Sequence, residues 1–218
     1  FIILDINMKE KDTRCLQRGH EDIKKSGGTN RTLRLPEANT RDKDTKCLQR
    51  DDNHKYCVRH SKSHRTVRAF NLLDKVNMKI VSFIELLNFK YHKEPNIKRL
   101  VSGYKKEVLY EILPQSPHVA YVKNKGDKLA LCLQVEKHES KFVDINTLMF
   151  VTLHEISHIA SKSMGHTNEF RKNFRFILDE AVKARIYEPE DYSKSPVRYC
   201  GMMIKHNPYF DIKINSES

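Results

Sequence analysis

The sequence contains no tryptophan, only seven glycines and seven prolines, and no long hydrophobic run. A membrane-spanning helix needs about 20 consecutive apolar residues, and no stretch of this chain approaches that length. So few glycines exclude a collagen-like repeat, and the absence of sustained heptads excludes a long coiled coil. The composition therefore predicts a globular chain that does not cross a membrane.

Cysteine is sparse as well, with five residues in 218 and no Cys-x-x-Cys pair. A small secreted scaffold that is held together by disulfides has a denser and usually even set of cysteines. We therefore expect free thiols and an intracellular protein, in the cytoplasm or the nucleus. No secretory signal peptide is expected, because the apolar start at residues 1–4 ends at Asp5, although the chain begins with Phe rather than Met.

Positive charge is in excess, with 40 Lys and Arg against 28 Asp and Glu, which gives a formal net charge of +12 at pH 7. A basic chain can bind nucleic acid or acidic surfaces. The charges are scattered rather than clustered, so a solvated surface is the simpler interpretation. Contact with DNA stays open as an alternative.

The first 66 residues differ from the rest of the chain. From residue 8 onward they contain few apolar side chains, which follow neither the period of a strand nor that of a helix. A segment that buries so little cannot offset its ordering entropy, so residues 1–66 are predicted to be a disordered, basic extension. We place a folded domain at residues 67–206 and a short tail at 207–218.

An octapeptide occurs twice within this extension, as KDTRCLQR at residues 11–18 and as KDTKCLQR at residues 43–50. Two copies are too few for a solenoid, so a duplicated segment is the simpler interpretation. Cys57, His60 and His64 follow with a spacing like that of metal ligands. Their pairing is irregular and no core surrounds them, so we do not expect a metal site there.

Beyond residue 66 the hydrophobic pattern becomes periodic. Apolar residues recur every three or four positions from Val67, which predicts an amphipathic helix that ends near His92. Short apolar runs interrupted by Pro and Gly predict strands, two of them joined as a hairpin. The order of elements favours an α+β fold. The further predicted elements are a helical turn at 96–103, strands at 108–113, 118–122 and 129–135, and helices at 146–160 and 168–186.

One short motif in the first of these later helices carries chemistry. His154 and His158 stand four residues apart, so both imidazoles lie on one face of the helix and can bind one metal ion. Glu155 lies close enough to reach a water on that metal. Zinc lowers the pKa of such a water toward about 7, and a glutamate can accept its proton and pass it to a leaving amine. This HExxH pattern therefore predicts a zinc-dependent hydrolase.

The surroundings of the motif are apolar, because residues 148–153 read Leu-Met-Phe-Val-Thr-Leu. A helix that is apolar on both sides of its polar pair is expected to be buried. Burial of two histidines and a glutamate without partners is costly, and a bound metal removes that cost. The alternative, a polar stripe on a surface helix, fits this apolar context poorly.

A catalytic zinc keeps three protein ligands and one open position. Gly165 can adopt a positive φ and end the helix, and His166 then lies in a bend that can return to the metal. We therefore predict His166 as the third ligand. The alternatives are Glu169, or Asp179 and Glu180 on the following helix.

Residues 154–158 (HEISH) and 165–170 (GHTNEF) resemble the HExxH…GH…F signature of WLM-type and SprT-like zinc metallopeptidases. In particular they resemble the compact WLM-like metallopeptidases of large DNA viruses and of some algae or protists. The likeness covers about residues 75–206, although this chain lacks the proline that many WLM members have before the third histidine. The stretches that continue it are 124–126, 131–133, 146–149, 191–193 and 199–202.

The resemblance implies a small zincin-like domain with an active-site helix, a small β-sheet and further helices. It implies one zinc ion bound by His154, His158 and His166, with Glu155 as the catalytic base. A donor near the metal should stabilise the transition state, and Tyr192 and Tyr199 are the candidates in the C-terminal stretch. Core tyrosines are the alternative for both, and the hairpin edge at residues 118–135 is a candidate substrate strand.

Three functions remain open at this point. The prediction is a zinc metallopeptidase that acts on a protein or peptide, and members of the resembled families digest proteins cross-linked to DNA. The first alternative is a non-catalytic zinc-stabilised module that binds nucleic acid or protein, and the second is a hydrolase of small amides. Glu155 favours catalysis, because a structural zinc site needs a fourth ligand rather than a base.

Overall fold

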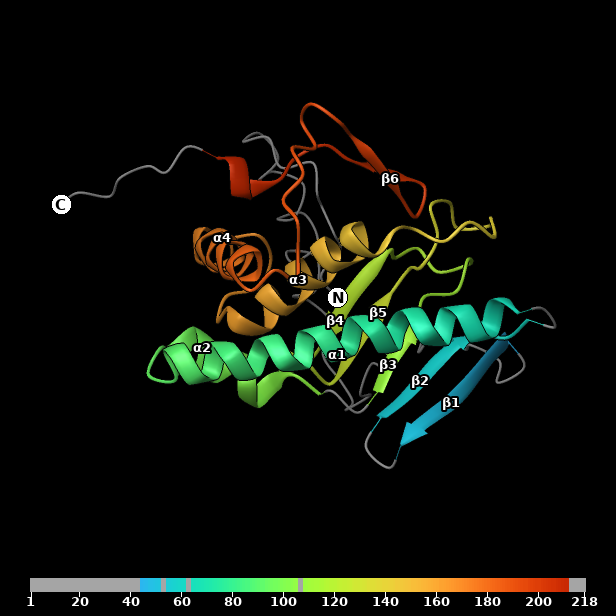
Figure 1. Cartoon of the computed structure of the whole chain (residues 1–218), viewed down its shortest axis with the longest axis horizontal. Coiled ribbons are helices and arrows are strands. Elements are labelled where there is room, and N and C mark those ends of the chain that lie inside the picture. Colours follow the sequence, from blue (N-terminus) through green and yellow to red (C-terminus); the bar gives the residue numbers. More distant parts are fainter. Residues whose placement is uncertain (1–43, 52–53, 62–63, 106–107, 212–218) are drawn as a thin grey trace, which may run out of the picture.

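The computed structural model describes residues 44–51, 54–61, 64–105 and 108–211, and every structural statement below refers to this part of the chain. The fold is α+β, as predicted (Figure 1). In chain order its elements are β1 (Thr45–Asp51), β2 (His54–Arg59), α1 (Arg65–Tyr91), α2 (Pro95–Gly103), β3 (Val108–Glu111), β4 (Ala120–Lys123), β5 (Lys128–Leu131), α3 (Ile145–Ala160), α4 (Asn168–Lys183), β6 (Val197–Tyr199), β7 (Met202–Ile204) and the 3-10 helix η2 (Pro208–Phe210).

Five strands form the main sheet in the order β1-β2-β3-β5-β4. The β2/β3 and β3/β5 pairs are parallel, whereas β1/β2 and β4/β5 are antiparallel hairpins. The long helix α1 runs across the sheet and contacts β2 and β3 (Figure 1). Helix α3 packs against α1, α2, α4 and β4, so the predicted active-site helix lies at the centre of the fold and next to an edge strand.

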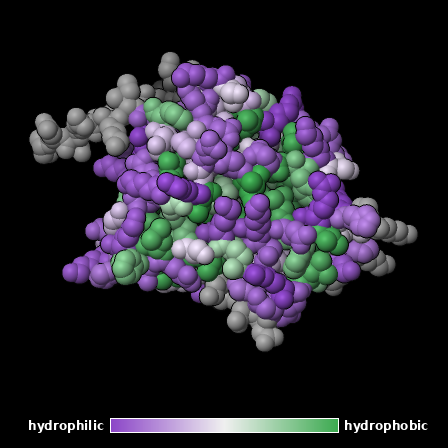
Figure 2. All heavy atoms as spheres, in the orientation of Figure 1, coloured by the Kyte–Doolittle hydropathy of each residue, from purple (hydrophilic) through white to green (hydrophobic). Residues whose placement is uncertain are grey.

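Helix α1 forms as its periodicity predicts. Its buried side chains recur at helical spacing and face the core. They include Leu73, Val76, Ile80 and Leu87. The exposed side chains of α1 are mostly polar, but Val67, Met78 and Phe89 are exposed as well, and Phe89 is 83% exposed. On the face shown in Figure 2, hydrophilic residues alternate with several groups of hydrophobic ones. None of the helices in the described ranges is long and apolar enough to cross a bilayer.

The prediction of disorder is wrong for residues 45–51 and 54–59, which form β1 and β2. Strand β2 pairs in parallel with β3 and buries Tyr56, Cys57 and Val58. Hydropathy missed this strand because three buried residues in a row give no helical or alternating signal. The second copy of the octapeptide supplies most of β1, while the first copy lies outside the described residues. At the other end, part of the predicted tail forms η2, which packs against α4.

The expectation of free thiols is also wrong for four of the five cysteines. Cys47 and Cys57 face each other across the β1/β2 hairpin and form a disulfide, and Cys132 and Cys200 form a second one. The second pair is separated by 68 residues but its Cα atoms lie 6.0 Å apart. Tertiary proximity of this kind cannot be deduced from cysteine spacing. Cys15 lies outside the described residues, and the cellular compartment stays a prediction.

Candidate metal centre

Helix α3 carries the HExxH residues into the protein interior. Its N-terminus is capped by Asp144, whose side chain accepts a hydrogen bond from the backbone amide of Thr147 at 2.9 Å. Every residue from Thr147 to Ala160 is buried. A helix that is buried all round places its polar side chains where only neighbouring protein groups or a bound ligand can satisfy them.

Three imidazoles converge at the C-terminal half of this helix. The Nε2 atom of His154 lies 3.2 Å from Nε2 of His158 and 3.1 Å from Nε2 of His166. One nitrogen atom from each ring lies within 4.8 Å of the other two. His154 and His158 meet because they are one turn apart, whereas His166 reaches them from the loop between α3 and α4. Among the described residues, this is the one group of three such side chains that could hold a metal ion.

The alternative third ligands are engaged elsewhere. Glu169 accepts two hydrogen bonds from the main chain of the loop that carries His166. Asp179 and Glu180 form ion pairs with basic side chains of α1 and α4. The structure thus brings together the three histidines that the sequence singled out.

The protonation of the imidazoles suits a metal ligand. Burial, together with the neighbouring histidines, lowers the pKa of His154 well below its usual value. Burial, followed by the charges of His166 and Lys125, lowers the pKa of His158 to about 2. These two rings are therefore neutral at physiological pH, and a neutral ring offers a lone pair to a cation.

Phenylalanines enclose the imidazoles. Phe170 stacks on His158 with ring centroids 4.1 Å apart and also meets the edge of His154 at 4.9 Å. Phe174, one turn later on α4, contacts His154 at 5.0 Å. The phenylalanine of the sequence motif, Phe170, therefore forms an apolar wall on one side of the imidazoles.

Glu155 is fully buried beside the histidines. Neither carboxyl oxygen makes a hydrogen bond of normal geometry to a residue that the structure describes. Burial raises its pKa well above the usual value, and the backbone of Val122 on β4 opposes this shift. An unpartnered buried carboxyl is costly unless a ligand compensates it.

The donor set fits a divalent cation such as zinc. Three imidazole nitrogens converge on one another, and the rings of His154 and His158 are neutral. Three nitrogen ligands with an acidic side chain next to them match a zinc site that keeps a position open.

The match to a family model covers residues 98–207, half of the chain, and the model describes the WLM domain. The chain belongs to the WLM family. The matched region contains α3, α4 and all three histidines, and this confirms the resemblance that the motif indicated. The strands β1 and β2 and the whole of α1 lie outside it.

Viral proteins are among the relatives of this WLM domain. Uncharacterized protein R325 of Acanthamoeba polyphaga mimivirus is 37% identical over 111 residues, which are 51% of this chain and 56% of that protein. Uncharacterized protein 136R of Invertebrate iridescent virus 6 is 33% identical over 84 residues, 38% of this chain and 47% of that one. The chain thus spans about half the length of the curated relatives that it matches. Among solved structures, Wss1 from Saccharomyces cerevisiae is 21% identical, with a TM-score of 0.44 over 59% of this chain and 88% of that one.

The two candidate tyrosines of this WLM domain are buried, each in its own surroundings. The Tyr199 hydroxyl lies 2.9 Å from the carbonyl of Cys132 and 3.1 Å from that of Val119, to which it donates. Tyr192 packs edge-on against Phe150 with centroids 5.0 Å apart. Burial raises the pKa of both, and Glu155 adds to the shift of Tyr199. Both contribute to the core, and their part in catalysis stays a prediction.

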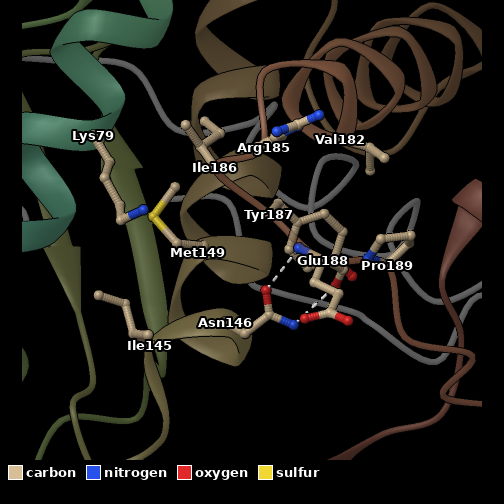
Figure 3. Close-up of a pocket in the computed structure, with 10 residues that line it drawn as sticks. All are labelled: Lys79, Ile145, Asn146, Met149, Val182, Arg185, Ile186, Tyr187, Glu188 and Pro189. Carbon is tan, nitrogen blue, oxygen red and sulfur yellow. Dashed lines mark hydrogen bonds between the residues drawn. The ribbon is translucent and has the colours of Figure 1, made fainter.

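A separate cavity of about 510 Å³ lies at the other end of α3. It is lined by the first residues of α3, the end of α4 with residues 185–189 that follow it, and Lys79 of α1 (Figure 3). Two of its lining residues pair with each other: the Asn146 side-chain amide donates to the carbonyl of Glu188 at 2.8 Å and accepts from the amide of Glu188 at 2.9 Å. None of the three histidines lines this cavity, so it is distinct from the metal centre.

Sequence reasoning missed the charged residues that support the loop before His166. Lys125 lies in the β4–β5 turn and Arg99 on α2, and both donate to carbonyls at the C-terminal end of α3. Basic side chains commonly satisfy the free carbonyls of a helix end. These two come from distant parts of the chain, however, and no local pattern connects them to α3.

Proposed function

We propose that this WLM domain is a zinc-dependent peptidase with one catalytic ion. The observation that carries the proposal is the convergence of three imidazoles, of which those of His154 and His158 are neutral, next to a buried glutamate whose carboxyl oxygens make no hydrogen bond of normal geometry to the described residues. His154, His158 and His166 would hold the ion. When bound, zinc supplies a Lewis acid that acidifies water and polarises a carbonyl group.

Glu155 is the proposed catalytic base. Burial alone favours its protonated form, and a cation held by the neighbouring imidazoles favours the carboxylate that the reaction needs. Glu155 accepts a proton from water while the water oxygen bonds to the scissile carbonyl carbon. It then donates that proton to the amide nitrogen as the C–N bond breaks. The products are a carboxylic acid and an amine.

Strand β4 is the proposed binding strand for an extended substrate. It is an edge of the sheet, pairs only with β5 among the described strands, and lies against α3. A peptide that added to this edge would run past Glu155, because Val122 of β4 neighbours that carboxyl. This arrangement favours protein and peptide substrates over small amides, which have no main chain to pair with a strand.

The presence of Glu155 favours catalysis over a purely structural metal site. A structural zinc is usually closed by four protein ligands, and the cluster in the described residues offers three. DNA-associated proteins are the substrate class that we propose for testing, because the chain carries a net charge of +12.

Metal analysis with a cleavage assay tests the proposal. We expect one zinc per chain and cleavage of casein or of a quenched peptide library, which a chelator stops and added zinc restores. Stoichiometric zinc without any cleavage would instead support the zinc-stabilised binding module. A parallel series with single-stranded DNA tests whether DNA-associated proteins are the substrates. Faster cleavage of DNA-bound proteins supports this substrate class, and an unchanged rate excludes stimulation by DNA.

A further inference from the structure

The loop between α3 and α4 brings His166 to the other two histidines, and its backbone is tied down by charged side chains. Lys125 is central to this arrangement. Its Nζ donates to the carbonyls of His158, Ser161 and Ser163 at 3.1, 2.7 and 2.8 Å. An ammonium group has three protons, and all three are used on the end of α3 and the start of the loop.

Glu169 completes the arrangement from the other side. Its two carboxylate oxygens accept hydrogen bonds from the backbone amides of Lys162 and Ser163, each at 2.8 Å. Arg99 then bridges the two halves, because its guanidinium donates to Glu169 at 3.1 Å and to the carbonyl of Ala160 at 2.8 Å. Cations thus bind the loop carbonyls and an anion binds the loop amides.

The elements that carry these cations are held close together. The β4–β5 turn presses against the end of α2, since a Cβ atom on Gly126 would lie 1.8 Å from the carbonyl oxygen of Gly103. Gly126 also has a φ of +128°, and Lys125 itself has a φ of +58°. Because the backbone is packed so tightly here, the position of the Lys125 main chain is fixed, and its ammonium group points to the loop rather than to solvent.

We propose that Lys125, Arg99 and Glu169 are positioning residues that fix the α3–α4 loop and thereby hold His166 where it completes the metal site. The inference rests on the metal site of the proposed function. The contacts described above go to main-chain groups at the end of α3 and in the loop, except that Arg99 also contacts the carboxylate of Glu169, and these partners are not reacting atoms. Hydrogen bonds from the two loop amides, that of Lys162 first, lower the pKa of Glu169 to about 2, so its carboxylate persists at physiological pH.

Zinc affinity tests this proposal independently of peptidase activity. Groups that orient a metal ligand typically change metal affinity by about 10–100-fold when they are removed. We therefore expect Glu169→Ala and Lys125→Met each to weaken zinc binding by about that factor in competition with a chelating dye. Glu169→Gln keeps one acceptor for a loop amide and should lose less. Asp179→Asn is the control. Asp179 lies on the same helix, and its carboxylate pairs with Arg175 rather than with the loop, so this variant should bind zinc as the parent does.

Two further readings separate positioning from general stabilisation. Cobalt-substituted protein should show a changed visible absorption in Glu169→Ala and an unchanged one in Asp179→Asn. Thermal unfolding of the zinc-free proteins measures how much each substitution changes the stability of the fold in the absence of metal. Parental zinc affinity and cobalt spectra in Glu169→Ala, Glu169→Gln and Lys125→Met would overturn the proposal, even if the parent is an active peptidase. Weakened zinc binding with no peptidase activity in the parent would support positioning and reject the proposed function.

Discussion

Replacement of Glu155 with glutamine is expected to reduce peptide hydrolysis by at least about 100-fold, and up to about 10,000-fold, while the protein still binds zinc. Loss of a positioned general base typically costs this much. Glutamine has nearly the shape of glutamate but cannot accept and return a proton. Because Glu155 is buried without a normal hydrogen bond to the described residues, the neutral amide should not cost stability through a lost partner.

The measurement is the initial rate of cleavage of one quenched peptide by the parent and the variant at equal zinc content. Glu85→Gln is the matched control, because Glu85 is exposed on α1 and lies outside the metal centre. Its rate should equal that of the parent. A Glu155→Gln variant that cleaves at the parental rate with full zinc occupancy would show that another group moves the proton.

Replacement of His158 with alanine is expected to remove most of the stabilisation that zinc gives to the fold. A ligand that binds only the folded state at 1,000 times its dissociation constant stabilises by about 4 kcal/mol. His158 is fully buried and supplies one of three converging nitrogens. With two imidazoles left, the same zinc concentration should stabilise the variant far less.

Thermal unfolding of both proteins with zinc and with chelator measures this difference. His92→Ala is the control, because His92 is exposed at the end of α1, and its zinc-dependent shift should match that of the parent. An equal zinc-dependent shift in His158→Ala would mean that the ion binds elsewhere. Comparison of the chelated proteins separates the loss of the side chain from the loss of the metal.

The predictable part of the site was the part with a helical period. His154 and His158 are four residues apart in an apolar helix, so the sequence alone placed both on one face. The predicted helices at 146–160 and 168–186 left only a short bend for His166, and α3 and α4 confirm this placement. Gly165 has the expected positive φ of +74°, but it does not end the helix, because α3 already ends at Ala160 with Ser161 as its C-cap.

The parts that escaped prediction depend on contacts between distant segments. Strand β2 is stable because it pairs with β3, and Glu111 of β3 forms a buried ion pair with Arg65. Because the first 66 residues have low hydropathy, the sequence predicted neither the β2/β3 pairing nor the Arg65–Glu111 ion pair. Disulfide pairing and the binding of Lys125 to the end of α3 likewise depend on tertiary proximity. Spacing and composition contain no information on such pairs.

X-ray absorption at the zinc edge of the metal-loaded protein tests the central claim most directly. We expect three imidazole nitrogens at about 2.0–2.1 Å from the zinc and oxygen as the remaining ligand, with a weaker imidazole signal in His158→Ala. Sulfur neighbours at about 2.3 Å, or a shell of oxygen atoms without imidazole, would contradict it.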